Sequence, residues 1–320
     1  YLLIKGCFYT AFFLKIRRIK MKCIFCGRSE EQLNERNYFT LEHIIPKSLG
    51  NNVLTLNCVC KECNSNLGKY VDNYFVDNMI VKIPRQILGL KGQSGKIPNA
   101  FKDGIDEYGN KVKISSDFKP TIIPKVVVEE NNGCQNIRII APDKDIAKSI
   151  IKKILDRKNI SEDKIQEVLN KVEQEPVSSY NPKVNYNFKI ELNRFYLEAL
   201  KIAYEYMIFI AGDIYLKDVC GRKIQNILNK AISGEYEKTC PYIENVCMMP
   251  SEVYEIFSKV LPENSHFLMI HKIPDNKLVV EISIFLQKAF SFSIIVSNNA
   301  EQYSCEDIRF IEPVKKFYND

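Results

Sequence analysis

The sequence contains little histidine, and this scarcity limits where acid–base chemistry can occur. Only three of the 320 residues are histidines, and His43 is the only one before position 266. The ordinary pKa of histidine lies close to neutral pH, which makes it a common proton acceptor in active sites. His266 and His271 alternate with apolar residues in "HFLMIHKI", a pattern typical of a strand, and we interpret both as structural. His43 is therefore the main candidate for a proton-transfer residue.

An excess of positive charge is also lacking over most of the chain. The net charge is +6, but residues 1–20 carry five basic side chains and no acidic one. The rest of the chain therefore carries only about +1. This balance excludes a globally basic body, so a surface that binds nucleic acid must be a local patch.

No apolar run approaches the roughly 20 residues that a bilayer-spanning helix requires, so no membrane partner is expected. Residues 7–14 are apolar, but most of the nearby charge follows them, unlike the order in a secretory signal. We expect residues 1–20 to be translated upstream sequence or a disordered extension, with an amphipathic surface helix as the alternative. Without a secretory signal, the eleven cysteines indicate a reducing cytoplasm and favour metal ligation over a disulfide framework.

Four of the cysteines form two Cys-x-x-Cys pairs, Cys23 with Cys26 and Cys60 with Cys63, separated by 33 residues. Each pair can present two thiolates to one ion, and two pairs complete the tetrahedral four-sulfur shell of a structural zinc site. The sequence therefore predicts a structural Zn²⁺ held by these four residues. Cys58 could substitute for one of them, but we interpret it as a core thiol.

Between the two pairs, the segment "TLEHIIPKSLGN" places Glu42 directly before His43. In an active site, the histidine would deprotonate water, and the carboxylate would hold a divalent ion that stabilises charge on a phosphate. A strand sends neighbouring side chains to opposite sides, so a bend is needed to aim both at one substrate. The alternative is a surface histidine paired with Glu42. Asn64, which follows the second cysteine pair, is either a helix N-cap or a further oxygen ligand of the ion.

Residues 22–76 are predicted to fold in the order strand, loop, strand, helix. The strands are expected at 38–42 and 53–59, and apolar residues recur at helical spacing from Asn64 onward. Residues 83–98 are rich in Gly, Pro and Lys, which indicates a linker or an extended arm.

The remainder of the chain has the pattern of a mixed α+β domain. Its expected elements are two hairpins within 100–141, helices at 143–156, 161–174 and 186–212, and strands between 266 and 298. On the third of these helices, we interpret the aromatic residues Phe188, Phe195 and Tyr196 as core residues.

The run from Cys23 to Asp72 resembles an HNH endonuclease of the zinc-bound ββα-metal type. The resemblance rests on two segments: "LEHIIPKSLGN" lies between the two cysteine pairs, and "CKECNSNLGK" begins with the second pair. The resemblance implies hydrolysis of DNA phosphodiester bonds with a divalent ion, usually Mg²⁺ or Mn²⁺. It implies that His43 is the general base and that Glu42 ligates the catalytic ion. Asn64 falls on the final motif position, where many members carry asparagine in place of histidine. The chain thus resembles a His-Asn-Asn variant, and the weaker ligand strength of an amide leaves the metal role of Asn64 open.

The resemblance also implies a middle asparagine that orients the loop between the two strands. We assign this position to Asn57, with Asn51 and Asn52 as alternatives. Basic side chains near the motif would suit contacts with DNA phosphates, which position DNA without reading its sequence. These side chains are Lys47, Lys61 and Lys69.

The sequence therefore predicts an α+β protein in which a small zinc-stapled ββα-metal nuclease domain precedes a larger mixed α+β domain. The expected boundaries are an extension at 1–20, the HNH domain at 21–80, a linker or arm at 81–99, and a domain at 100–320 that recognises a target or partner.

The leading hypothesis is a cytoplasmic endonuclease that cuts double-stranded DNA, with Zn²⁺ as the structural ion and Mg²⁺ or Mn²⁺ as the catalytic ion. A zinc-stapled DNA-binding or regulatory module without cleavage is the first alternative. A zinc-scaffold module that binds proteins is the second. A homodimer and a defence-system partner are both compatible with these hypotheses.

Overall fold

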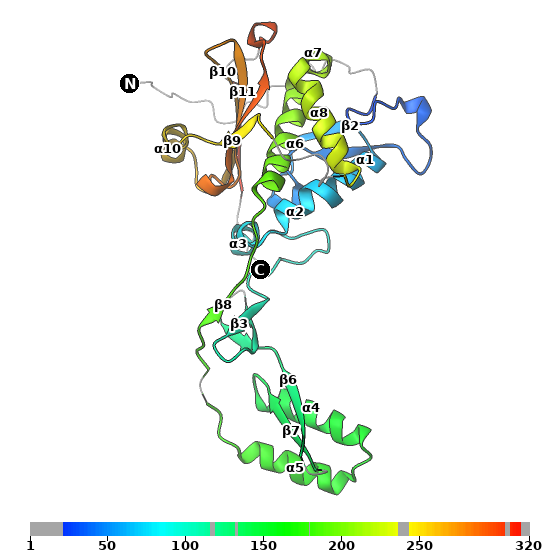
Figure 1. Ribbon diagram of the computed structural model, residues 1–320, viewed down its shortest axis with the longest axis vertical. Helices are drawn as coiled ribbons and strands as arrows, with labels where there is room; N and C mark the ends of the chain where they lie inside the picture. Colours follow the sequence, from blue (N-terminus) through cyan, green and yellow to red (C-terminus); the bar gives the residue numbers. More distant parts are fainter. Residues whose placement is uncertain are drawn as a thin grey trace. The chain divides into compact units, whose positions relative to one another are not determined.

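The computed structural model describes residues 22–115, 119–131, 134–178, 180–235, 243–304 and 308–314 (Figure 1). Residues 1–20, for which we expected an extension, lie outside this part of the chain. The described residues form an α+β protein with two compact units. The first unit contains the described residues up to Lys96 together with those from Ile190 onward, and the second contains Ile97–Lys189.

The first unit opens with a strand–loop–strand–helix module, in the order that the sequence predicted. Its elements are the 3-10 helix η1 (Glu30–Gln32), strand β1 (Phe39–His43), the 3-10 helix η2 (Lys47–Leu49), strand β2 (Thr55–Cys60), helix α1 (Lys61–Leu67), the π-helical turn η3 (Gly68–Asp72) and helix α2 (Asn73–Val76). β1 and β2 are antiparallel. Between the paired residues Thr40–Val59 and Glu42–Leu56, β1 has one residue and β2 has two, so the pairing contains a β-bulge. Such a bulge bends the strand and redirects its side chains, which is common beside active sites.

Residues 81–99, expected to be a linker or arm, contain most of a helix instead. Helix α3 (Met79–Ile87) begins after Asn78, whose side chain accepts a hydrogen bond from the backbone N–H of Ile80. Arg85 in this helix is buried, and its guanidinium donates hydrogen bonds to the carbonyls of Ser48 and Val76. The segment is therefore bound to the module, although its Gly and Pro content suggested an extended chain.

The C-terminal part of the first unit supplies a five-stranded antiparallel sheet and the helices beside it. Its elements are α6 (Leu192–Ala211), α7 (Asp213–Lys217), α8 (Val219–Ile232), β9 (Val246–Met248), α10 (Ser251–Val260), β10 (Ser265–Ile273), β11 (Lys277–Ser283), η4 (Lys288–Phe290), β12 (Ser291–Ser297), η5 (Ala300–Gln302) and β13 (Ile308–Pro313). The strand order is β13-β10-β11-β12-β9. The strands predicted between 266 and 298 are confirmed as β10, β11 and β12.

Helix α6 joins the two parts of this unit into one core. It contacts β9, β11 and β12 of the sheet as well as α2 and η3 of the module (Figure 1). Phe75 of α2 packs edge-on against Phe195 of α6 and Phe290 of η4, with ring centroids 5.0 and 5.8 Å apart. A single cluster of buried apolar residues extends through both parts. This grouping differs from the separate domain that we expected at 100–320, because the apolar surfaces of the module and α6 bury each other.

The helix predicted at 186–212 begins only at Leu192. Phe188 therefore lies before the helix and is 54% exposed, so its assignment to the core was wrong. Phe195 is buried as predicted, and Tyr196 packs against Phe292 of β12 with ring centroids 6.1 Å apart.

The second unit combines small sheets with a pair of helices. Its elements are β3 (Gly104–Asp106), β4 (Lys111–Ile114), β5 (Pro120–Ile122), β6 (Lys125–Asn131), β7 (Cys134–Ile140), α4 (Lys144–Arg157), α5 (Glu162–Gln174) and β8 (Val184–Asn185). Strands β5-β4-β3-β8 form one sheet, and β6 pairs with β7 in a hairpin. An apolar groove of about 920 Å³ lies between this hairpin and the helices, lined by residues such as Ile137, Ile139, Ile151 and Val172. The two helices and the hairpins agree with the sequence prediction.

Among the helices that the structure describes, none combines the length and the apolar character needed to cross a bilayer.

Candidate active site

The four cysteines of the two Cys-x-x-Cys pairs lie together at one end of the module. The sulfur atoms of Cys23, Cys26, Cys60 and Cys63 are all within 4.8 Å of one another, and the Cys26 and Cys60 sulfurs are 3.8 Å apart. A tetrahedral zinc ion with Zn–S bonds of about 2.3 Å requires sulfurs about 3.8 Å apart, so these residues fit a zinc ion. Burial raises the pKa of the Cys58 thiol to about 12. Cys58 is thus a neutral thiol outside the cluster, in agreement with its prediction as a core residue.

Side chains of α6 and α8 hold the turn between Cys23 and Cys26. The Tyr204 hydroxyl and the Gln225 amide both donate hydrogen bonds to the carbonyl of Ile24, and the Asn229 amide donates to that of Phe25. A buried carbonyl without such a partner would cost free energy. The C-terminal helices are therefore part of the support of the cysteine cluster.

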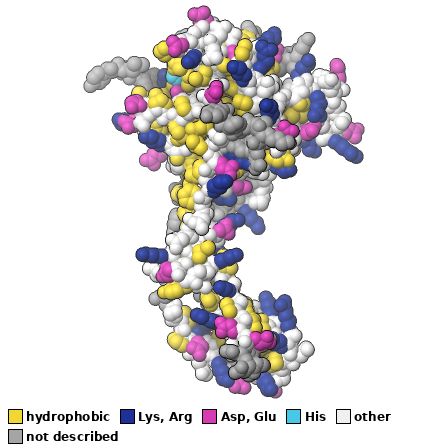
Figure 2. Space-filling model, in the orientation of Figure 1, with side chains coloured by type: hydrophobic (Ala, Val, Ile, Leu, Met, Phe, Trp, Pro, Cys, Tyr) yellow, Lys and Arg dark blue, Asp and Glu magenta, His cyan; other side chains and the backbone are white. Residues whose placement is uncertain are grey.

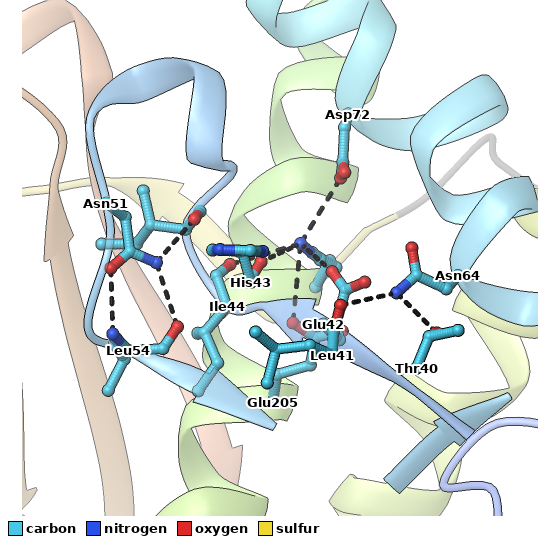
Figure 3. A network of polar contacts seen from close by, with 12 residues as sticks. Thr40, Leu41, Glu42, His43, Ile44, Asn51, Leu54, Asn64, Asp72 and Glu205 are labelled. Atoms are coloured by element: carbon cyan, nitrogen blue, oxygen red, sulfur yellow. Dashed lines mark hydrogen bonds and ion pairs between the residues drawn. The ribbon is translucent and has the colours of Figure 1, made fainter. Parts of the chain in front are cut away.

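Glu42 and His43 lie at the end of β1, where the chain leaves the strand (Figure 3). Glu42 is 4% exposed, and burial raises the pKa of its carboxyl to about 7, although the Lys201 ammonium opposes this shift. His43 is half-buried, and its pKa is lowered by burial and by the positive charges of Lys47 and Lys201, against a smaller opposite effect of Asp72. A lowered pKa keeps the imidazole neutral at neutral pH, which is the form that accepts a proton.

Asn64 of α1 binds the same strand immediately before this pair. Its Nδ2 donates hydrogen bonds to the Thr40 hydroxyl at 3.0 Å and to the Leu41 carbonyl at 3.1 Å (Figure 3). Asn64 is not a helix N-cap, because α1 begins at Lys61 with Cys60 in the cap position. Both amide hydrogens are directed to β1, and the Oδ1 atom can accept a cation. The structure thus ties Asn64 to the strand end that carries Glu42 and His43.

Comparison with known proteins gives a family for the first part of the chain. Residues 23–80, less than a fifth of the chain, match the profile of the HNH endonuclease family. This segment is an HNH endonuclease domain. A search of curated proteins and a search of solved structures found no match. The family implies a nuclease with a nucleic-acid substrate, and the match ends before the second unit begins.

The loop between the strands of the HNH domain is organised by Asn51. Its Nδ2 donates hydrogen bonds to the carbonyls of Ile45 and Leu54 at 2.7 and 3.0 Å, and its Oδ1 accepts from the N–H groups of Val53 and Leu54. We had assigned this role to Asn57, which instead projects from β2 into solvent. The reason is strand alternation: Leu56 and Cys58 on either side are buried, so Asn57 faces outward.

Asn52, the other alternative, is exposed, and its side chain donates a hydrogen bond to the carbonyl of Gly50, two residues away. Asn51 is therefore the asparagine of this HNH domain that joins the start of the loop to its end.

The residue that sequence analysis missed is Lys201 of α6, which is fully buried beneath the strand end. Its Nζ lies 2.8 Å from Glu42 Oε1 and 3.5 Å from both Asp72 Oδ1 and Glu205 Oε2. It also donates hydrogen bonds to the carbonyls of His43 and Ile44 at 2.8 and 3.3 Å. Nearby acids hold the pKa of Lys201 above its usual range despite burial, so the ammonium stays charged.

The signal in the sequence was a group of charged residues, Glu198, Lys201 and Glu205, in the part of α6 from Phe195 onward, which is otherwise apolar or aromatic. Their spacing of three and four residues places them on one helical face.

The three lysines predicted to contact phosphate are exposed around the HNH domain. Lys61 lies over the Tyr38 ring, 5.2 Å from its centroid, and Lys69 donates a hydrogen bond to the Tyr70 hydroxyl. Lys47 lies in η2, close enough to His43 to lower its pKa. On the face seen in Figure 2, basic and acidic side chains are interspersed over the described surface. No one-sided basic surface is visible on that face, so these local lysines are the candidates for phosphate contacts.

The oxygen atoms near the strand end suit a hard divalent cation. Glu42 offers a carboxylate and Asn64 an amide oxygen, and these are ligand types that Mg²⁺ and Mn²⁺ accept. Among the described residues, the cysteine cluster is the only group of three or more His, Cys, Asp or Glu ligand atoms close enough to hold an ion. Magnesium often binds through one or two carboxylates plus water and substrate phosphate, so a small protein ligand set fits such an ion.

Proposed function

We propose that the chain is a metal-dependent DNA endonuclease that hydrolyses phosphodiester bonds in double-stranded DNA. The observation that carries this proposal is that Asn64 of α1 hydrogen-bonds to the strand that ends in Glu42 and His43, within the segment that matches the HNH endonuclease family. Neither a zinc scaffold nor a simple DNA-binding module requires a carboxylate, a neutral imidazole and an amide in this arrangement.

In the proposed mechanism, His43 takes a proton from the attacking water, because its lowered pKa keeps the ring neutral. Glu42 and Asn64 would hold Mg²⁺ or Mn²⁺, which would supply stabilisation of negative charge on the phosphate. Lys47, Lys61 and Lys69 contact the DNA backbone and position it without reading its sequence. Zn²⁺ on the four cysteines braces the fold, and Asn51 fixes the loop that follows His43.

Incubation of purified protein with supercoiled plasmid and Mg²⁺ or Mn²⁺ tests the proposal. We expect nicked or linear product that EDTA abolishes, and a loss of about 10²- to 10⁴-fold in rate for His43→Ala, the usual contribution of a general base. The matched control is His271→Ala, which removes a histidine outside the site. Cleavage by His43→Ala at the wild-type rate would refute the assigned mechanism.

The ion pair between Lys201 and Glu42 specifically favours a second function, a DNA-binding or regulatory module without cleavage. In this alternative, the lysine permanently neutralises the carboxylate that would otherwise hold the metal. Salt-sensitive DNA binding with no product at any Mg²⁺ or Mn²⁺ concentration would support it.

The remaining assignments follow from the same proposal. The reducing cytoplasm would keep the four cysteines available for zinc. The second unit, which the family match does not reach, would recognise the target or a partner such as a defence-system protein. A homodimer is compatible with a nuclease that cuts both strands.

A further inference from the structure

Helix α6 buries two acidic side chains and one lysine directly below the strand end of the HNH domain. Glu198 is 1% exposed, and Lys201 and Glu205 are fully buried. Burying charges costs free energy, and an apolar side chain of similar size would usually stabilise a core at least as well. Their presence therefore calls for a reason other than stability.

The contacts of Lys201 are concentrated on three consecutive residues of the HNH domain. An ammonium group has three N–H donors. The acceptors closest to Nζ are Glu42 Oε1 at 2.8 Å, the His43 carbonyl at 2.8 Å and the Ile44 carbonyl at 3.3 Å. All three donors are thus accounted for by residues 42–44, while Asp72 and Glu205, at 3.5 Å, contribute mainly their charge.

Two of these acceptors show that the chain bends at this point. In an extended strand, successive carbonyls point in opposite directions. The carbonyls of His43 and Ile44 nevertheless bind the same nitrogen atom, which is possible because β1 ends at His43. A bend here is what Glu42 and His43 need in order to act on one substrate, because they are neighbours in a strand.

We propose that Lys201 is a positioning residue of the nuclease site, which holds the bend after His43 and orients the Glu42 carboxylate so that the two side chains serve one phosphate. This inference rests on the proposed endonuclease function. Lys201 touches neither the reacting atoms nor the DNA in this proposal, and it acts through residues 42–44.

The charges around Lys201 determine how it can be tested. Among the described residues, Asp72 Oδ1 and both carboxylate oxygens of Glu205 are buried and find no hydrogen-bond partner, and the buried Glu198 carboxyl lies beside Asp72. Removal of the ammonium would leave Glu42 and these three acids without their shared cation, and breaking a buried ion pair destabilises a protein. Lys201→Met is therefore compared with the double variant Lys201→Met/Glu205→Gln. The double variant removes one buried acid together with the lysine, so we expect it to be less destabilised than Lys201→Met.

The chain offers a matched control in Arg85. Its guanidinium is 2% exposed and also binds two backbone carbonyls, those of Ser48 and Val76, but it contacts neither Glu42 nor His43. Arg85→Met removes a similarly buried cation at another point of the first unit. Zinc content and thermal unfolding of the full-length variants establish which are folded, and all rates are measured well below the lowest unfolding midpoint.

The experiment measures plasmid cleavage as a function of Mn²⁺ concentration, and DNA binding without divalent ions. Loss of a group that orients a metal ligand typically costs about 10- to 100-fold in metal affinity or activity, and we expect a loss of this size for both Lys201 variants. DNA affinity should stay near wild type, and Arg85→Met should keep its cleavage rate. In Glu42→Gln, addition of Lys201→Met should cause a smaller loss than Lys201→Met causes in the wild type, because part of the effect of the lysine passes through Glu42.

The outcomes separate the two proposals. A wild-type protein that never cleaves would overturn the endonuclease proposal and this inference with it. An active wild type whose Lys201 variants cleave equally well would overturn only the role of Lys201. The role of Lys201 would also be overturned if Arg85→Met lost as much activity as Lys201→Met. It would be overturned as well if the fold-losses in rate of Lys201→Met and Glu42→Gln multiplied in the double variant.

Discussion

His266 shows at the scale of one residue how the C-terminal part of the chain supports the HNH domain. It is fully buried in β10, and its Nε2 donates a hydrogen bond to the carbonyl of Leu49 in η2 at 2.9 Å. The backbone N–H of Phe285 donates to Nδ1, so the ring is the neutral Nε2–H tautomer. Burial lowers the pKa of His266 to about 4. The prediction that this histidine is structural agrees with these contacts.

The buried neutral ring predicts a pH dependence of stability. As pH falls below about 6.5, the unfolded chain binds a proton on His266, whereas the folded protein does so only near pH 4. This difference of roughly 2.5 units removes about 3 kcal/mol from the free energy of unfolding between pH 6.5 and pH 4. The contribution of His266 to stability is thus fully present above pH 6.5 and is lost on acidification.

Urea unfolding of wild type and His266→Gln at pH 7.5 and 4.5 measures this effect. Glutamine can still donate to Leu49 but does not titrate, so the variant should lose less stability on acidification than the wild type. Equal losses in both proteins would contradict the prediction.

Sequence analysis identified the residues whose chemistry depends on local spacing. The cysteine pairs, Glu42 next to His43, and Asn64 follow from a short motif. Lys201 could not be identified in this way, because 158 residues separate it from His43 and nothing local indicates which strand α6 will meet. A charged residue in the middle of an apolar helix was the available signal.

At the scale of elements, the loop from Ile44 to Leu54 depends on one side chain. Asn51 is completely buried and makes four hydrogen bonds that join the start and the end of the loop. Three asparagines were candidates from the sequence, because strand boundaries set which of them faces inward. β2 begins at Thr55 and buries Leu56 and Cys58, so Asn57 lies on its outer face, whereas Asn51 lies buried in the loop.

We expect Asn51→Ala to lower the free energy of unfolding by about 2 kcal/mol or more, because buried backbone groups lose their partners. Asn57→Ala serves as the control and should stay within about 0.5 kcal/mol of wild type, as for most exposed positions. Urea unfolding gives both values, and hydrogen exchange of residues 44–54 locates the change. A larger loss for Asn57→Ala than for Asn51→Ala would show that the assignment of the loop residue is mistaken.

At the scale of the whole molecule, residues distant in sequence form the first unit. The HNH domain packs on α6, with the Phe25 and Tyr204 rings 5.6 Å apart, and their apolar residues share one core. The second unit, Ile97–Lys189, has its own sheets and helices and is an insertion between the two parts of the first. A linear division at residue 100 could not reveal this arrangement.

This organisation predicts which fragments fold. Residues 22–96 alone should give no cooperative thermal transition, because their apolar surface has lost α6 and α8. The full chain with residues 97–189 replaced by a flexible Gly/Ser linker should unfold cooperatively and retain about one zinc ion per chain, as expected for one four-cysteine site. Calorimetry and zinc analysis of both proteins test this, and cooperative, zinc-bound unfolding of the short fragment would contradict it.

The sequence by itself determined the HNH domain, its cysteine cluster, the strand–loop–strand–helix order and the principal candidates of the site, because these features depend on residues close together in the chain. The tertiary structure decided that Asn51 and not Asn57 holds the loop, that Lys201 lies beneath Glu42 and His43, and that residues from 190 onward complete the first unit. These features arise from burial, which depends on which apolar surfaces meet. Local patterns show that a surface is apolar, and only the folded chain shows what covers it.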